Sequence, residues 1–337
     1  MKKNKVTLGY IFNTYNLLII LVGVICILSI LLPTSFPTLF NLRSILNYQA
    51  IVILLAVAVT IPIAAGHFDL SAGYSSCLLH ILTVGLICRQ EIPWPLAVLI
   101  ILSLGALIGF ANGILVTRVG IHSFIATLGI GYIVYGCAYW YSGGTQVLGT
   151  LLPESFLKIN TTIGIIPTTF IITMVISILV HIFLEYLSAG RCLYFLGANE
   201  KAANLTGISS KKYTLLAFVL SGVLVAMASV MMASVFRVGQ TSVGPNYLMN
   251  SFAGALMSSV AFKSGKSNVW GTVCSVLLMA VIVSGLQQMG TAYFVEPLIQ
   301  GLMLIVAVSW AVITKRNRAT KIKEEKDNEI RKGRSEA

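Results

Sequence analysis

Charged residues are scarce in this chain of 337 residues. Only 10% of the residues are Asp, Glu, Lys or Arg, whereas 57% are hydrophobic, and the acidic residues number just 11. Soluble domains carry about 25% charged residues, so this composition excludes a chain built to fold in water. Apolar runs of about 18 or more residues, the length of a membrane-spanning helix, recur from end to end. The sequence therefore predicts an all-α, polytopic membrane protein.

Motifs for metal or nucleotide binding are also missing. The six cysteines have no Cys-x-x-Cys spacing and mostly lie in apolar runs, where thiols act as small hydrophobic groups. The segment Ser264–Ser267 reads SGKS, but a phosphate-binding loop would need glycine where Val260 stands. No His-Glu-x-x-His motif indicates an intramembrane metalloenzyme. We expect no catalytic residue, metal or cofactor in this chain.

Ten crossings fit the apolar runs when a span of about 20 residues is the ruler. The expected ranges are Leu17–Leu32, Ile51–Ala65, Ala72–Ile87, Pro95–Val116, Phe124–Tyr141, Ile165–Tyr186, Tyr213–Val235, Leu248–Phe262, Val269–Met289 and Val295–Thr314. The first run ends without a clear Ala-x-Ala site, which favours a retained crossing over a cleaved signal peptide. The membrane domain is thus expected to cover residues 1–314.

The tail, residues 315–337, is rich in charge and has almost no apolar side chains. Such a segment cannot bury a core, so we expect it to be disordered or a frayed helix. It is either simply solvated or held against anionic lipid through its basic residues.

Positive charge is distributed unevenly between the predicted loops. With the amino terminus inside, only four of the 23 Lys and Arg residues fall outside: Arg43, Arg89, Lys158 and Arg237. An excess of Lys and Arg in cytoplasmic loops is the usual signature of membrane orientation. The sequence therefore predicts both termini in the cytoplasm, and nucleic acid is not needed to explain the net charge of +12.

Polar residues interrupt the apolar sequence at Ala64–Gly73, which reads AAGHFDLSAG. Lipid offers no hydrogen-bond partners, so this backbone must face protein or a water-filled cavity, and we expect a broken second or third crossing here. Asp69 is an intramembrane carboxylate and, with His67, Ser71 and Gly73, a candidate for the translocation pathway. The alternative is that Asp69 caps the next helix and only holds a re-entrant turn, with His67 as a loop residue.

A glycine ladder, Gly105, Gly109 and Gly113, repeats every four residues and lets helix backbones approach closely. It indicates packing within one subunit, a subunit interface, or a wall of the pathway. Asn112 beside it is a polar side chain that needs a partner and is a further pathway candidate.

The cytoplasmic loop at residues 187–212 contains a segment typical of a soluble helix, LGANEKAANLTGI at 196–208. Asn199 is a good helix cap, Glu200 suits the first turn, and Gly207 can end the helix in a left-handed conformation. A helix of about eight residues is not stable alone in water. We expect it to dock on another protein through the small apolar face of Ala202, Ala203 and Leu205, after SAGR at 188–191 has ended the preceding crossing.

This loop resembles that of permease subunits in the ribose-type sugar family of ABC importers, G-R-x-x-x-A-x-G-G-N-x-x-A-A-x-x-S-G-I. The matching positions are Arg191, Gly197, Asn199, Ala202, Ala203, Gly207 and Ile208. The segments FDLSAG and FIATLG, at 68–73 and 124–129, resemble two further motifs of that family in the same order.

The resemblance implies a permease subunit in the bacterial inner membrane that moves a small sugar delivered by an extracytoplasmic binding protein. Its loop around Glu200 would be a coupling helix seated on cytoplasmic ATPase subunits, which would bind the ATP. Leu248 and Asn250 stand where relatives carry acids, and residues 257–268 replace a glycine-rich stretch, which favours a heterodimer with a second permease over a homodimer. The alternative class is an ion-coupled secondary transporter that uses Asp69, although carboxylates are scarce in its membrane segments.

Overall fold

The computed structural model describes residues 8–309, apart from 261, 263, 264, 293, 304, 307 and 308. The tail at 315–337 and the first seven residues lie outside the described residues. The long helices are α1 (Leu8–Leu31), α2 (Leu39–Ala64), α3 (Ser71–Cys88), α4 (Trp94–Ile114), α5 (Ser123–Ser142), α7 (Thr168–Tyr186), α10 (Ser210–Phe236), α11 (Val243–Met257) and α12 (Val269–Gln288). Residues 295–303 are helical as well.

Short elements connect these helices. The helical ones are η1 (Leu115–Val119), α6 (Glu154–Leu157), η2 (Lys158–Asn160), α8 (Ser188–Ala198), α9 (Glu200–Leu205) and η3 (Ser258–Val260). Four two-residue strands, β1 (Val147–Leu148), β2 (Thr162–Ile163), β3 (Ile166–Pro167) and β4 (Val238–Gly239), pair antiparallel as β1 with β4 and β2 with β3. The described chain is therefore a helix bundle with small strand pairs in its connections, as the all-α prediction requires.

Seven helices are long and apolar enough to cross a membrane: α2, α3, α4 with η1, α5, α7, α10 and α12. They correspond to seven of the ten predicted crossings. In the first predicted crossing, only Tyr15–Leu31 forms an apolar helix, and it is shorter than the others. α11 has 15 residues, and the last predicted crossing is described only in part. The multi-pass prediction is thus confirmed, while the count of ten stays a prediction.

The second crossing is longer than its apolar run suggested. α2 has 26 residues and begins at Leu39, where the Thr38 hydroxyl accepts the backbone N–H of Asn41 at 3.2 Å. The first half of α2 contains polar residues that face other helices and a cavity. These residues lower the local hydropathy, so the apolar run begins only at Ile51. The predicted broken crossing is not confirmed, since α2 and α3 are each continuous and are joined by residues 65–70.

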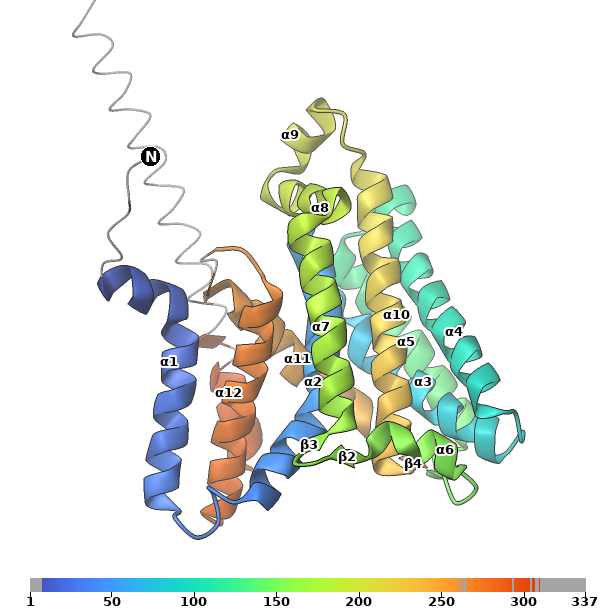
Figure 1. Ribbon diagram of the computed structural model, residues 1–337. Coiled ribbons are helices and arrows are strands. Elements are labelled where there is room, and N and C mark those ends of the chain that lie inside the picture. The colour runs from blue at the N-terminus through green and yellow to red at the C-terminus, as the bar shows by residue number, and fades with distance from the viewer. Residues whose placement is uncertain are drawn as a thin grey trace, which may run out of the picture.

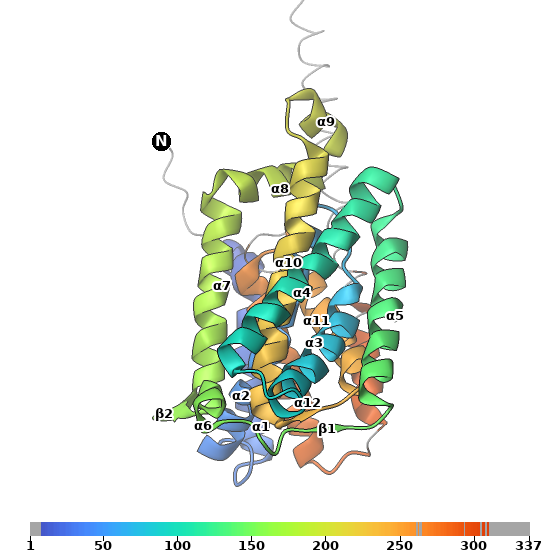
Figure 2. The same cartoon turned by 90° about the vertical axis from the view of Figure 1, so that its right-hand side faces the viewer.

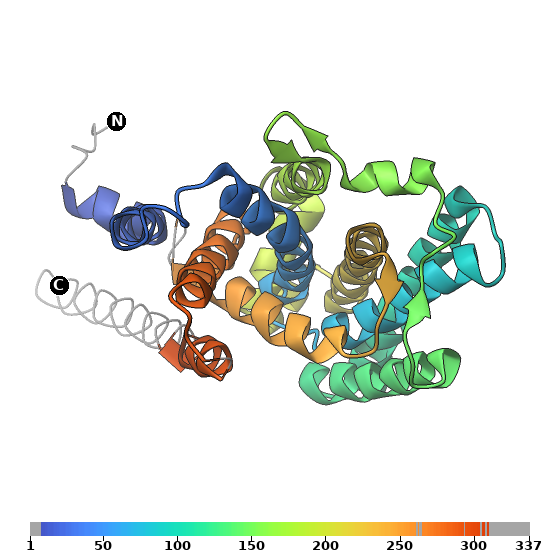
Figure 3. The ribbon, with the colours of Figure 1, turned by 90° about the horizontal axis from the view of Figure 1, so that it is seen from below.

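The bundle has two distinct ends (Figure 1). α8 and α9 lie at one end, which we call the α9 end, and the β2–β3 pair and α6 lie at the opposite end, which we call the hairpin end. A quarter turn about the vertical axis keeps α9 as the projecting element beyond the helix ends (Figure 2). Seen from the hairpin end, α1 stands at one side of the bundle, next to α12 (Figure 3).

Two halves of the chain repeat one order of elements in opposite directions. α2 runs toward the α9 end and is followed by α3, whose first residues are Ser71-Ala72-Gly73. α10 runs toward the hairpin end and is followed by α11, whose first residues, Val243-Gly244, come directly after Ser242. Gly73 and Gly244 lie against each other, so the two inner helices begin side by side. α4 packs along α10, and α12 packs along α2.

The glycine ladder lies against α10. A Cβ at Gly105 would overlap Gly222 and Ala226, and one at Gly109 would overlap the carbonyl of Phe218. In a membrane, small residues bring helix backbones together where no hydrophobic effect drives association. Packing within one subunit, the first of the predicted alternatives, is therefore confirmed for the ladder.

Candidate functional site

The connection between α2 and α3 passes through the interior of the bundle. Gly66 adopts φ 85°, which turns the chain away from α2. Side chains of α5 then satisfy the backbone: Phe68 N–H donates to Ser123 Oγ at 3.2 Å, and Leu70 N–H donates to Thr127 Oγ1 at 3.0 Å. Backbone without helical hydrogen bonds is thus matched to hydroxyls of a neighbouring helix, as a nonpolar environment demands.

Asp69 lies at the centre of a buried polar network, with only 2% of its surface exposed. Its Oδ1 accepts the backbone N–H of Ser71 at 3.1 Å and the Ser71 hydroxyl at 2.6 Å. Its Oδ2 accepts the Ser221 hydroxyl at 2.8 Å, and Ser221 is near the middle of the 27-residue α10. The carboxylate therefore ties the start of α3 to α10.

Asn112 joins the same network from α4. Its Nδ2 donates to Ser71 Oγ at 2.7 Å, and the side chain is fully buried. Three of the predicted pathway candidates, Asp69, Ser71 and Asn112, are thereby brought together. Gly73 lies two residues beyond Ser71 on α3, where an added Cβ would collide with Leu248.

His67 does not join Asp69. Its Nε2 lies 3.2 Å from Thr214 Oγ1, and its ring lies 6.0 Å from that of Phe218, both on α10. Burial lowers the pKa of His67 below its ordinary value, and the nearby Glu200 opposes this shift with a smaller effect. His67 thus sits between the interior network and the α9 end.

The predicted coupling segment forms two helices. The preceding crossing ends at Tyr186, as predicted, directly before SAGR, and SAGR itself forms the first turn of α8 from Ser188. Asn199 caps α9 as predicted, its Oδ1 accepting the Ala202 N–H at 3.1 Å, and Gly207 has φ 83° just beyond the helix.

The exposed surface of α9 differs from the predicted face. Ala203 is fully buried, whereas Leu205 is 89% exposed. The chain turns back after the helix, and the Ile208 N–H donates to the Ala203 carbonyl at 3.0 Å. Glu200 is exposed on the same helix, and Arg191 is exposed on α8. Ala203 therefore shapes the loop from within, and Leu205 is the apolar side chain offered to a partner.

α8 touches the end of α2 through a backbone contact. A Cβ on Gly197 would overlap the carbonyl oxygen of Ala64, and the Gly197 backbone also lies against Gly66. Gly197 is the next-to-last residue of α8, two residues before the Asn199 cap. The projecting α9 is thus linked through this contact of α8 to residues 65–70, the connection that carries Asp69.

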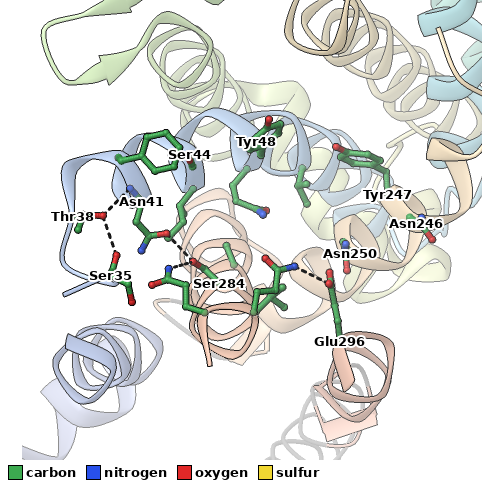
Figure 4. A pocket seen from close by; sticks show the side chains of 18 of the residues that line it. Ser35, Thr38, Asn41, Ser44, Tyr48, Asn246, Tyr247, Asn250, Ser284 and Glu296 are labelled. Atoms are coloured by element: carbon green, nitrogen blue, oxygen red, sulfur yellow. Dashed lines mark hydrogen bonds between the residues drawn. The ribbon is translucent and has the colours of Figure 1, made fainter. Parts of the chain in front are cut away.

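A cavity of about 690 Å³ was missed by sequence reasoning. It lies between α2, α11, α12, the end of α10 and Glu296, toward the hairpin end (Figure 4). We call it the amide-lined cavity, because six amide side chains line it: Asn41, Gln49, Asn246, Asn250, Gln287 and Gln288. The available signal was the run of polar residues in the first half of α2, but nothing local indicates which helices would face them.

Multiple apolar helices, with a buried polar network between them and a short projecting helix at one end, define a multi-pass membrane protein. The sequence profile of a family described as the permease component of the branched-chain amino acid transport system matches residues 41–308. The chain belongs to this permease family. It is thus a transport component and not an enzyme.

Individual relatives carry names of sugar and signal-molecule permeases. The chain is 29% identical to the ribose import permease protein of Bacillus subtilis over 84% of this chain and 88% of the relative. It is 25% identical to the D-allose transport system permease protein of Escherichia coli K12, over 91% and 94% of the two chains. It is 26% identical to the autoinducer 2 import system permease protein of Photorhabdus temperata, over 76% and 78%. The resemblance to ribose-type permeases is confirmed, and no solved structure matches the chain.

Proposed function

We propose that this chain is the membrane-spanning subunit of an ATP-driven importer for a small sugar or sugar-like solute. The family match and the names of the relatives support a permease, and those names favour a sugar over an amino acid. The chain crosses a bacterial inner membrane ten times, with both termini on the cytoplasmic side and residues 1–314 as the membrane domain. A binding protein outside the membrane delivers the solute.

The projecting α9 carries the proposal for energy coupling. This helix of six residues holds Leu205 out from the bundle at 89% exposure, with Asn199 as its cap. A helix this short is not stable alone, and an exposed leucine on it is suited to a groove on a soluble partner. We assign the exposed surface of Arg191, Asn199, Glu200 and Leu205 to contact with a separate ATPase subunit, with Gly197, Ala202, Ala203 and Gly207 shaping the loop. The ATPase, and not this chain, binds ATP.

A second permease subunit completes the assembly, and we favour a different chain over a second copy. Leu248 and Asn250 stand where the resemblance to ribose-type permeases implies acids, and a homodimer would repeat both replacements around one pathway. Apolar side chains are exposed on the outside of the helices. We expect lipid to surround the assembly wherever these side chains do not contact another subunit.

Ion coupling through Asp69 receives less support. Both carboxylate oxygens of Asp69 already accept hydrogen bonds from protein donors, at 2.6 to 3.1 Å. A carboxylate occupied in this way is suited to holding the turn into α3.

Replacing Leu205 with Asp tests the coupling assignment. The change places a charge on an exposed side chain, so it leaves folding intact but disrupts an apolar docking contact. We expect uptake to fall about tenfold or more, the size of a typical interface hot spot. The measurements are solute uptake in proteoliposomes and co-purification of the ATPase subunit from the same operon in mild detergent.

The matched control is Ile163→Asp, which puts the same charge on an exposed apolar residue of β2, at the hairpin end opposite α9 (Figure 1). It should leave uptake and ATPase recovery unchanged. Full uptake with Leu205→Asp would show that α9 does not dock the ATPase. Recovery of two copies of this chain, and no second permease, in an ATPase-active complex would contradict the heterodimer.

A further inference from the structure

The amide-lined cavity has the size and position of a binding site within a single subunit. Its volume of about 690 Å³ falls in the range of about 300–1,000 Å³ that is usual for small-molecule sites. It reaches from Thr38, before the start of α2, to Asn250 on the inner helix α11, so it leads from the hairpin end into the bundle. The labelled side chains of α2, α11 and α12 converge on this space (Figure 4).

The lining combines many polar groups with a larger apolar surface and is nearly uncharged. Besides the six amides it includes the hydroxyl groups of Ser44 and Tyr48, and Glu296 is its one charged residue among those described. Lys, Arg and His are absent from the described lining. Glu296 accepts hydrogen bonds from Gln287 Nε2 at 2.9 Å and from Gln300 Nε2 at 3.1 Å, which hold its carboxylate at the cavity wall. An anionic ligand would meet this carboxylate without a compensating cation.

Two amide oxygens of the cavity have no hydrogen-bond partner among the described residues. Ser284 Oγ donates to Asn41 Oδ1 at 2.9 Å, and Gln288 Nε2 donates to Ser284 Oγ at 3.2 Å, but Oε1 of Gln288 stays unpaired. Oδ1 of Asn250 is buried and unpaired as well. An unsatisfied buried acceptor costs about 1–3 kcal/mol, so such groups are retained where they serve a purpose. Hydroxyl donors of a ligand would satisfy both oxygens.

An apolar surface also lines the cavity. The ring of Tyr48 on α2 stacks on that of Phe236 at the end of α10, with centroids 6.1 Å apart and planes inclined by 23°. Both residues line the cavity. A ligand with hydroxyl groups at its edges and C–H groups on its faces matches this combination of amides and aromatic rings.

We propose that the amide-lined cavity binds a neutral polyhydroxylated solute, that Asn250 and Gln288 accept its hydroxyl groups, and that Glu296 selects against phosphorylated or carboxylated forms. This inference rests on the proposed function as a sugar permease, and it places a solute site inside this subunit. Charge on the solute, and not size alone, then decides entry from the hairpin end.

Protection of a cavity cysteine from thiol labelling tests the site directly. Ser284→Cys is made in the full-length chain after the native cysteines have been replaced, and the chain is assembled with its transport partners in proteoliposomes. D-ribose and D-allose should slow labelling at Ser284→Cys several-fold, whereas D-ribose 5-phosphate should not. A cysteine at Thr145, on the exposed α5–β1 connection, is the matched control and should label at the same rate with and without sugar.

Adding Glu296→Gln should allow ribose 5-phosphate to protect Ser284→Cys, because the neutral amide no longer repels the phosphate. Asn250→Leu should raise the KM for uptake about 3- to 10-fold, the loss of one neutral hydrogen bond, and leave kcat unchanged. Ser177→Ala removes another unpaired buried hydroxyl, on α7 and outside the cavity lining, and should leave KM unchanged.

The outcomes separate this inference from the proposed function. Uptake of ribose or allose without any protection of Ser284→Cys would overturn the cavity site and leave the sugar permease standing. Equal protection by ribose and ribose 5-phosphate would overturn the role of Glu296. Absence of both sugar uptake and protection would overturn the sugar permease together with this site.

Discussion

At the scale of single residues, Asp69 shows how a carboxylate is accommodated among membrane helices. Its two oxygens accept one N–H and two hydroxyl groups, and Ser71 passes the network on to Asn112. An unpaired charge in this setting would cost several kcal/mol, so each donor matters more than it would at a surface. The network holds α3, α4 and α10 in one arrangement.

Ser221→Ala should destabilise the protein measurably, because it removes one of three donors to the buried carboxylate. A hydrogen bond to a charged group is worth about 1.5–3 kcal/mol, and we expect the melting temperature in detergent to fall by about 5 °C. Ser234→Ala is the matched control on α10, since the Ser234 hydroxyl donates only to Met231 of its own helix. Identical melting of the two variants would mean that Ser221 does not stabilise Asp69.

At the scale of elements, the contact between α8 and the end of α2 is made by backbone. Gly197 lies against Ala64 and Gly66 with no room for a side chain. Residues 65–70 then lead directly to Asp69, so a displacement of α8 would be transmitted to the start of α3. The close packing of protein interiors makes such contacts transmit movement instead of absorbing it.

Gly197→Ala should uncouple the loop from the bundle. Its Cβ would overlap the Ala64 carbonyl, so α8 must shift, and we expect solute uptake to be lost while the chain still inserts into the membrane. Uptake and membrane yield are measured side by side. Gly23→Ala on α1 is the control, because no atom lies within 4 Å of the added Cβ. Normal uptake with Gly197→Ala would show that this contact does not transmit coupling.

At the scale of the whole molecule, the two ends of the bundle differ in charge as well as shape. Lys201, Lys211 and Lys212 lie at the α9 end, on α9 and at the start of α10, whereas Arg43 reaches the turn of the β2–β3 pair, donating to the Gly164 carbonyl at 3.1 Å. The excess of basic residues therefore coincides with the end that carries α9. We infer that this end faces the cytoplasm.

Thiol labelling of intact cells should reveal this orientation. In a cysteine-free background, a cysteine at Thr145 should react with an impermeant reagent from outside, and one at Lys201 should react only after the membrane is opened. Both positions are exposed, so access depends on the side of the membrane alone. Labelling of Lys201→Cys in intact cells would contradict the proposed topology.

The amino-acid sequence by itself determined the class of this protein and most of its helices. Hydropathy is a local property, so runs of apolar residues located the seven helices that are long and apolar enough to cross a membrane within several residues, apart from the start of α2. The cap at Asn199 and the turn at Gly207 are also local, because each depends on neighbours a few residues away. The resemblance to ribose-type permeases rested on contiguous motifs, and the match over most of the chain confirms it.

Only the tertiary structure decided which faces meet. Ala203 and Leu205 are near neighbours in one short helix, yet one is buried and the other exposed, because the chain folds back at Ile208. The polar residues of α2 shorten its apolar run, and only the positions of α11, α12 and Glu296 gather them around a cavity. Sequence patterns report how each helix is divided into faces, but a cavity is formed by faces from distant parts of the chain, and long-range packing alone brings these together.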